Sequence, residues 1–210
     1  MKQIDTLITR YPQLEACKDD IARAYEILLE TYKQDRKLLV AGNGGSASDS
    51  EHIVGELMRE FRLKRKVYAE QVDAMMAIDP EMGKVLAENL QGALPAICLT
   101  GHSALTTAFM NDANADLIFA QQVNGYGKTG DVFLGISTSG NSKNVCYAAI
   151  TAKAKGLKVI GLTGAKESKL SSLADVCIRV SETETYKIQE LPLPVYHCLC
   201  LMLEDYFFGE

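Results

Sequence analysis

The sequence has 210 residues, of which 47 % are hydrophobic and 23 % charged, with a formal net charge of −5. This length fits one large domain, and the apolar content is enough to fill a sizeable core. A mildly acidic chain without an extended run of lysine and arginine has no electrostatic basis for binding nucleic acid or an anionic membrane.

Residues 1–36 show the apolar periodicity of helices, with a break expected at Pro12. We interpret them as an N-terminal helical extension of a single domain that spans residues 1–210. They carry more apolar residues than one covering layer needs, which favours oligomerisation. The N-terminus has no apolar run of the signal-peptide type, and no stretch reaches the roughly 18 apolar residues that span a bilayer. We therefore expect a cytoplasmic protein.

After residue 36, short and continuously apolar segments alternate with helical ones. This alternation is typical of a parallel sheet that is buried on both faces. We predict an α/β fold, a three-layer αβα sandwich around a five-stranded parallel sheet. The predicted strands are residues 37–42, 94–100, 130–137, 158–164 and 175–180. Helices are predicted at about 47–61, 104–110 and 118–128, before Gly156, and at about 190–207.

Two polar segments follow the first of these helices. The sequence "RLKRK", residues 62–66, predicts a solvated basic patch. Residues 67–92 form a partly helical excursion that we expect to break at "DPEMG". The six cysteines have no CxxC spacing and mostly lie in apolar runs, so we interpret them as reduced core residues.

Two of the predicted strands end in loops rich in glycine and serine, "GNGGSAS" and "STSGNS". The carboxyl ends of parallel strands lie at one edge of the sheet, where open α/β sheets bind ligands. Four hydroxyls before a helix N-terminus predict a phosphate site, whereas the alternative, a turn with an N-cap, needs only one. Neither loop has P-loop or GxGxxG spacing, so a small phosphorylated ligand is favoured over a nucleotide. The hydroxyl-bearing residues are Ser137, Thr138, Ser139 and Ser142.

His52 and Glu56 are four residues apart, on one face of the helix that leaves the first loop. Such a pair is more often a solvated surface pair, but its position beside the glycine loop favours an acid–base role. Gln189 and His197 form a second polar pair, and His197 in its apolar run is alternatively a core histidine. Pro194 would forgo a backbone hydrogen bond in a helix that begins near residue 190, which indicates a helix start or a kink.

Five segments carry a resemblance to a known family: "GNGGSASDSEHIVGEL", "FMNDANADLIFAQQV", "GDVFLGISTSGNSKNV", "VIGLTG" and "KIQE…H". In this order, and over most of residues 1–208, the chain resembles the sugar isomerase (SIS) domain family with its flavodoxin-like sheet. Within it, the chain is most similar to the sedoheptulose-7-phosphate isomerases, also called phosphoheptose isomerases.

The resemblance implies an aldose–ketose isomerase that converts sedoheptulose 7-phosphate to D-glycero-D-manno-heptose 7-phosphate through an enediol, for surface-glycan biosynthesis. It implies Glu56 as the base and His197 as its acid–base partner, in a homotetramer. It also implies zinc, with His52, Glu56, Gln189 and His197 as the ligands. The implied substrate contacts are Asn43, Gly44, Gly45, Asn111, Asp112, Ser137, Thr138, Ser139, Ser142 and Gln189.

The chain departs from the family pattern in two places. Residues 67–92 form an insertion between the base-bearing helix and the second strand, and Glu60 stands where an arginine is expected, with Arg59 one place earlier. Two other functions stay open at this point. One is a non-catalytic SIS protein that binds a phosphosugar or a replication initiator, and the other is an isomerase of a different sugar phosphate.

Overall fold

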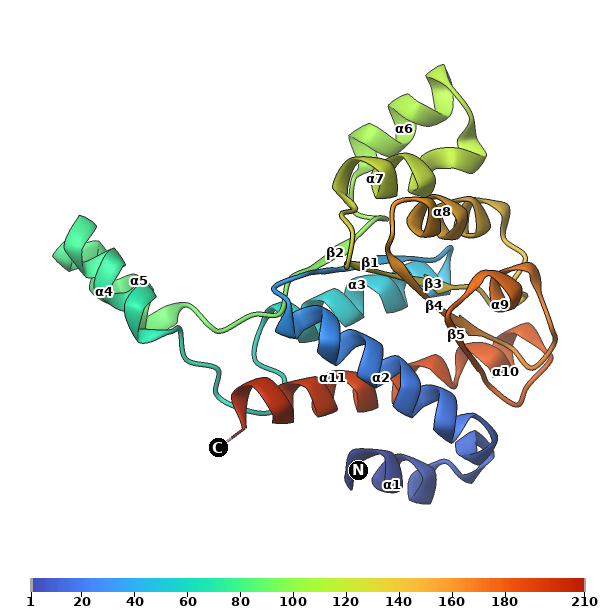
Figure 1. The fold of residues 1–210 in the computed structure, drawn as a ribbon, viewed down its shortest axis with the longest axis horizontal. Helices are drawn as coiled ribbons and strands as arrows, with labels where there is room; N and C mark the ends of the chain where they lie inside the picture. The colour runs from blue at the N-terminus through green and yellow to red at the C-terminus, as the bar shows by residue number, and fades with distance from the viewer. Residues whose placement is uncertain (1, 210) are drawn as a thin grey trace.

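The computed structural model describes residues 2–209 of the chain, and its centre is a five-stranded sheet (Figure 1). All neighbouring strands are parallel, and their order is β2-β1-β3-β4-β5. This is the flavodoxin-like order, so the predicted α/β class and topology are confirmed. The strands are β1 (Leu38–Ala41), β2 (Ala96–Cys98), β3 (Val132–Ile136), β4 (Lys158–Thr163) and β5 (Val176–Arg179).

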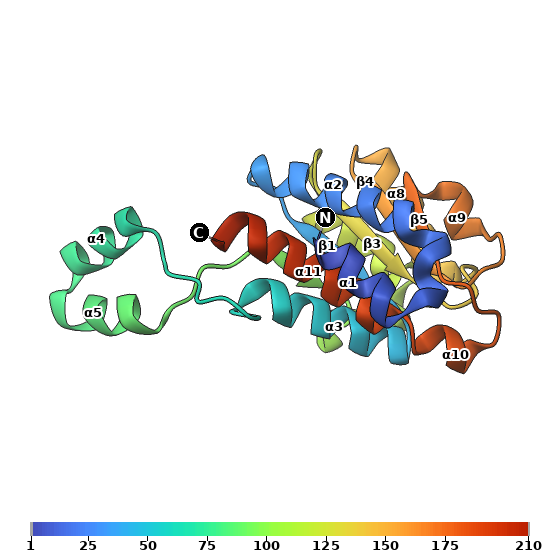
Figure 2. The same ribbon diagram turned by 90° about the horizontal axis from the view of Figure 1, so that it is seen from below.

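Helices cover both faces of the sheet, as the unbroken apolar strands predict. Successive strand residues point to opposite faces, so Val40 packs into one core and Leu39 into the other. The first face carries α2 (Lys18–Lys33), α3 (Gly45–Met58) and α11 (Pro192–Phe208). The second carries α7 (Ile118–Tyr126), α8 (Lys143–Ala154) and α9 (Lys169–Leu173). Figure 1 shows α7 and α8 above the strands and α2, α3 and α11 below them, and Figure 2 looks from below onto the layer of α2, α3 and α11.

The N-terminal segment is helical, with the expected break near Pro12. It contains α1 (Lys2–Arg10), the 3-10 helix η1 (Pro12–Cys17) and then α2. Helix α1 packs on α11, and α2 packs on β5 and α11. These helices therefore extend the first face of the sandwich, and their apolar positions join its core.

The last helix begins later than expected and differs from the sequence interpretation in one detail. Gln189 ends a separate short helix, α10 (Thr185–Gln189), and α11 starts at Pro192. Pro192 and Pro194 both fall in the first turn of α11, where backbone N–H groups have no intrahelical partner. Neither proline forgoes a hydrogen bond, so α11 needs no kink at these residues.

Helix α3 ends at Met58, three residues before the expected end, because Arg65 takes over its terminal carbonyl groups. The guanidinium donates hydrogen bonds to the carbonyl oxygens of Glu56 (2.9 Å) and Leu57 (2.8 Å) and to the carboxylate of Glu204 (2.9 Å). Arg65 is only 1 % exposed. The expectation that residues 62–66 form a solvated patch is therefore wrong for Arg65.

Residues 67–92 form a helical hairpin that projects from the body (Figures 1 and 2). It consists of α4 (Ala69–Ile78) and α5 (Pro80–Asn89). The break falls at Asp79, whose side chain accepts hydrogen bonds from the backbone N–H groups of Glu81 (3.0 Å) and Met82 (2.9 Å). The predicted interruption at "DPEMG" is thus an N-cap followed by proline in the first helical turn.

The six cysteines are free thiols, and four of them are buried, as expected of core residues. Between residues 2 and 209, no helix is both long enough and apolar enough to cross a membrane.

Candidate active site

The two glycine- and serine-rich loops meet at the carboxyl ends of β1 and β3, which are neighbours in the sheet. Asn43 in the first loop and Asn144 in the first turn of α8 exchange two side-chain hydrogen bonds, of 3.0 and 2.9 Å. The strand order reverses beside β1, which is where such sheets bind ligands. Sequence reasoning selected Asn43 but missed Asn144, whose position in the first turn after "STSGNS" was the available signal.

Gln189 reaches the first loop because residue 45 is a glycine. A Cβ atom on Gly45 would lie 3.2 Å from the Nε2 atom of Gln189, tighter than side chains normally pack. The preceding residue, Gly44, has φ of +56°, a backbone conformation that other residues rarely adopt. The structure therefore brings together Gly44, Gly45 and Gln189, which are three of the expected substrate contacts.

The second loop has the features of an anion-binding loop. The hydroxyls of Ser137 and Ser142 are 3.0 Å apart, and Ser142 makes no side-chain capping bond to α8. The N-cap alternative thus has no support from Ser142. Within residues 2–209, the backbone N–H groups of Thr138, Ser139 and Ser142 have no hydrogen-bond partner. Thr138 and Ser139 also line a cavity of about 200 Å³, together with Lys166 and the carboxylates of Glu167 and Glu182.

Asn111 and Asp112 lie apart from these loops. They end α6 (Ser103–Asp112), are exposed, and hydrogen-bond to each other at 2.8 Å. Helix α6 packs mainly on α7 and the short 3-10 helix η2 (Ala115–Leu117). Within the described part of one chain, no hydrogen bond connects Asn111 or Asp112 to another candidate residue.

The acid–base candidates converge on His52 from two helices. His52 Nε2 lies 3.1 Å from Glu56 Oε1 on α3 and 3.5 Å from His197 Nε2 on α11. Glu56 is 5 % exposed, so it does not belong to a solvated surface pair. Its other oxygen, Oε2, is buried and has no hydrogen-bond partner among residues 2–209. An unpartnered carboxylate oxygen is costly to bury, which is typical of a group that meets a ligand.

The environment keeps His197 neutral at neutral pH. Burial lowers the pKa of His197, and the charge of His52 lowers it further, while Glu56 acts in the opposite direction. A neutral imidazole has one donor and one acceptor nitrogen. His197 can therefore either take or give a proton.

A hydroxyl from α11 orients His52. The Tyr196 oxygen lies 3.0 Å from His52 Nδ1 and 3.3 Å from Asp49 Oδ1. Burial raises the pKa of Tyr196, so the phenol stays protonated. When this hydroxyl donates to Asp49, it accepts from His52 Nδ1 and fixes the orientation of the imidazole, whose Nε2 faces Glu56 and His197. Sequence reasoning missed both Tyr196 and Asp49, although Asp49 lies three residues before His52 on the same face of α3.

Three of the four expected zinc ligands lie together. Across residues 2–209, no three or more His, Cys, Asp and Glu side chains are arranged as a metal site. The chemistry of His52, Glu56 and His197 nevertheless fits zinc, which prefers imidazole nitrogen and carboxylate oxygen, and Glu56 Oε2 has no other partner here. The fourth expected ligand, Gln189, has its side chain beside Gly45 rather than with these three residues, and it is exposed.

Comparison with known proteins identifies the family of this chain. A family model described as SIS domain matches residues 74–164. The phosphoheptose isomerase of Rhodospirillum rubrum is 37 % identical over 92 % of this chain and 89 % of its own length. The chain belongs to the phosphoheptose isomerase family.

Solved structures of the family share the whole fold. The phosphoheptose isomerase GmhA from Neisseria gonorrhoeae superposes with a TM-score of 0.72 at 28 % identity, covering 96 % of this chain and 98 % of that one. A phosphoheptose isomerase from Francisella tularensis gives 0.74 at 28 % identity, covering 96 % and 94 %. The likeness to phosphoheptose isomerases thus extends over both helical layers and the sheet.

Proposed function

We propose that this protein interconverts sedoheptulose 7-phosphate and D-glycero-D-manno-heptose 7-phosphate. Relatives that carry the name phosphoheptose isomerase support this substrate class. The observation on which the proposal rests is the buried carboxylate of Glu56, which has one unpartnered oxygen and lies beside two imidazoles. A regulatory protein that only binds a phosphosugar would have no use for such a costly arrangement.

Two proton transfers at carbon and two at oxygen complete the reaction. Glu56 takes a proton from C1 of the ketose, and His197 delivers one to the oxygen on C2, which gives a cis-enediol. His197 then removes the proton from the oxygen on C1, and Glu56 returns its proton to C2. A positioned base and acid of this kind typically contribute factors of 10²–10⁴ each to the rate.

The loops anchor the substrate so that its first two carbons reach Glu56. The phosphate binds the unpartnered backbone N–H groups of Thr138, Ser139 and Ser142 and the N-terminus of α8, where the helix dipole favours an anion. Asn43, Gly44, Gly45 and Gln189 bind the sugar hydroxyls. Asn111 and Asp112 lie too far along α6 to join these contacts, and we assign them to the site of a neighbouring copy in a homotetramer.

Zinc is the proposed cofactor, held by His52, Glu56 and His197, whereas Gln189 lies beside Gly45 and is assigned to the sugar. When bound, a zinc ion polarises the substrate carbonyl and stabilises negative charge on oxygen. Metal analysis after dialysis against zinc measures this directly. We expect the variant His52→Ala to bind zinc at least tenfold more weakly than the variant His102→Ala, and equal affinities would contradict the ligand set.

The reaction is tested with sedoheptulose 7-phosphate in deuterated water. Deuterium at C2 of an aldose product would show proton exchange with solvent through an enediol. We expect Glu56→Gln to lower kcat by at least 10³-fold while still binding substrate, and Glu51→Gln on the exposed side of the same helix to keep wild-type kcat. Binding without turnover in the wild-type protein would support the regulatory alternative, and turnover of another ketose phosphate alone would change the substrate.

A further inference from the structure

The hairpin of residues 67–92, here called the arm, contacts the rest of the described chain at its base, where the Glu60 N–H donates to Gln91 Oε1 (2.8 Å). Helices α4 and α5 pack on each other and on no other element to a comparable extent. No residue of α4 is buried, and in α5 only Gly83 is. Figures 1 and 2 show the arm extending away from the body on two linkers.

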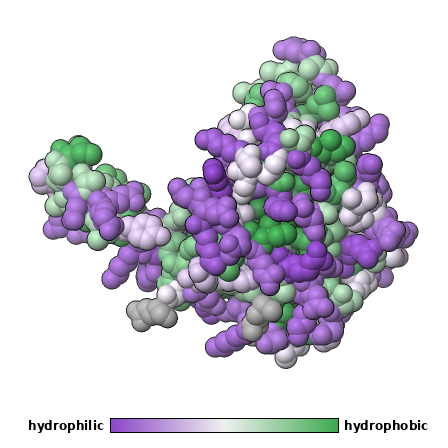
Figure 3. Space-filling model, viewed as in Figure 1, coloured by the Kyte–Doolittle hydropathy of each residue, from purple (hydrophilic) through white to green (hydrophobic). Residues whose placement is uncertain are grey.

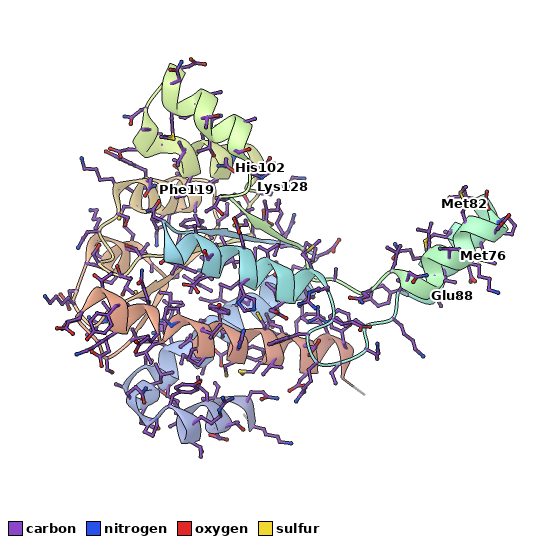
Figure 4. The ribbon with its side chains drawn as sticks, turned by 180° about the vertical axis from the view of Figure 1, so that it is seen from behind. Met76, Met82, Glu88, His102, Phe119 and Lys128 are labelled. Atoms are coloured by element: carbon purple, nitrogen blue, oxygen red, sulfur yellow. The ribbon has the colours of Figure 1, made fainter. Side chains whose placement is uncertain are left out.

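The arm presents an apolar stripe to solvent. Met82, Leu86 and Leu90 are spaced by four residues along α5 and its C-cap, which places them on one face. Figure 4 shows Met82 and Met76 toward the free end of the arm and Glu88 nearer its base, and Figure 3 shows hydrophobic atoms on its outer surface. Seven large apolar residues of the arm are exposed: Tyr68, Met76, Ile78, Met82, Val85, Leu86 and Leu90.

The arm is built as a specific structure rather than as a loose loop. A Cβ atom at Gly83 would lie 2.6 Å from the carbonyl oxygen of Met75, so the two helices approach closely at a glycine. At the base, the Gly92 N–H donates to the Arg65 carbonyl oxygen (2.8 Å), and Arg65 is fixed in the core. Two ten-residue helices are nevertheless too short to be stable in water alone. A surface that covers the two helices would therefore stabilise the arm.

The exposed apolar area is sufficient for such an interface. Ile78 is 86 % exposed, Met82 69 % and Tyr68 67 %. With ordinary side-chain areas, the seven residues expose roughly 800 Å² per arm, similar to the share of about 800 Å² that one partner contributes to a stable protein interface.

The net charge of the arm indicates which kind of partner it can bind. It contains five carboxylates and one lysine, a net charge of −4 within a chain total of −5. Nucleic acid and anionic membranes are therefore repelled, and two arms repel each other. The same chain offers exposed cations at Arg59, Arg62, Lys64 and Lys66, and exposed apolar side chains at Tyr147 and Ile150 on α8.

We propose that the arm is a docking element that lies on the body of a second copy of this chain. The second copy is present at equal concentration, carries both the complementary charge and apolar surface, and would bury the stripe of Met82, Leu86 and Leu90. Symmetric exchange of two arms would double the buried area. This inference stands whether or not the proposed reaction is correct.

Molecular mass in solution tests it. The variant M82D/L86D places two negative charges in the stripe. The control variant K84D changes the net charge of α5 by the same amount, −2, but at a position outside the stripe. By sedimentation equilibrium we expect the wild type and K84D to exceed the 23.0 kDa of one chain, and M82D/L86D to dissociate at least 100-fold more readily. A wild type of 23.0 kDa at tens of micromolar, or an unchanged mass of M82D/L86D, would overturn the proposal.

Two further measurements exclude a folding artefact. A variant with residues 67–90 replaced by a short Gly-Ser link should keep the body, since within residues 2–209 helices α4 and α5 pack mainly on each other. It should dissociate as M82D/L86D does. Hydrogen exchange should find slow amides in residues 69–89 of the wild-type assembly and fast ones in M82D/L86D, with β3 and β4 slow in both. Fast exchange of these arm amides in the wild-type assembly would show that nothing covers the arm.

Discussion

At the scale of single residues, Tyr196 determines how His52 presents its nitrogen to the site. Its hydroxyl contacts both His52 Nδ1 and Asp49. The variant Tyr196→Phe keeps the ring packing and removes both hydrogen bonds, so His52 can rotate or change tautomer. We expect kcat/KM to fall about tenfold, and the free energy of unfolding to fall by only about 1 kcal/mol, the typical contribution of a hydrogen bond.

Steady-state kinetics over a range of pH and thermal unfolding measure the two effects. Tyr206→Phe, on the same helix and half exposed, is the matched control and should change neither. A loss of stability with an unchanged pH profile of kcat/KM would mean that the Tyr196 hydroxyl is only structural.

The sequence could predict His52 and Glu56 as a pair because four residues make one helical turn. It could not show that His197 meets them, since that contact depends on how α11 crosses α3. Tyr196 was missed for the same reason. In an apolar run a tyrosine is interpreted as a core residue, and its ring is indeed buried. Only its hydroxyl belongs to the site.

At the scale of elements, the ion pair of Arg65 and Glu204 holds α3, α11 and the base of the arm together. Both side chains are 0 % exposed. The variant Arg65→Met leaves the Glu204 charge buried and frees the last carbonyls of α3. We expect the free energy of unfolding to fall by about 3–5 kcal/mol, as for other broken buried pairs.

Chemical denaturation measures this loss. Arg62→Met removes an exposed pair with Asp205 and should cost less than about 1 kcal/mol. Adding Glu204→Gln to Arg65→Met should recover part of the stability because no charge then remains buried. Equal losses for the Arg65 and Arg62 variants would contradict the structural role of Arg65.

Asp175 connects three elements at the edge of the sheet. Burial alone would raise its pKa, but the Val159 N–H, Lys153 and Lys158 outweigh burial and hold the pKa below 3.8. A lowered folded-state pKa stabilises the fold above the unfolded-state pKa, and this stability is lost as pH falls through the folded-state pKa. We expect Asp175→Asn to lose about 1–2 kcal/mol at pH 7, and its difference from the wild type to shrink below pH 3.8.

Urea unfolding at several pH values checks the Asp175 prediction, with Asp73→Asn on the arm as the control. A difference that stays constant down to pH 3 would mean that the ionised carboxylate contributes nothing to the stability.

Element order and strand positions could be predicted because continuous apolar runs and helical periodicity are local properties. The end of α3 could not be predicted, because it depends on the hydrogen bonds of Arg65. A segment rich in lysine and arginine is normally interpreted as exposed to solvent. The arm could be placed as an interrupted helical excursion from "DPEMG". Its projection from the body follows from the lack of extensive packing between α4 and α5 and the rest of residues 2–209. No local sequence pattern indicates this.

At the scale of the whole molecule, ligand binding should stabilise the fold through the two loops that join β1 to α3 and β3 to α8. Sedoheptulose 7-phosphate at 100 times its Kd should add about 2.7 kcal/mol to the free energy of unfolding. For a chain of this size, that raises Tm by roughly 5–11 °C. Differential scanning fluorimetry measures the shift, and sedoheptulose without the phosphate should give almost none.

The double variant S137A/S142A separates anchoring by the loop from non-specific stabilisation by an anion. It removes two hydroxyls that contact each other in the free protein, at 3.0 Å, and are proposed to contact the phosphate. We expect most of the shift to disappear, while S172A on α9 keeps it. Because the shift needs binding but no turnover, Glu56→Gln should also keep it. A full shift in S137A/S142A would place the phosphate outside this loop, even in a protein that isomerises the sugar.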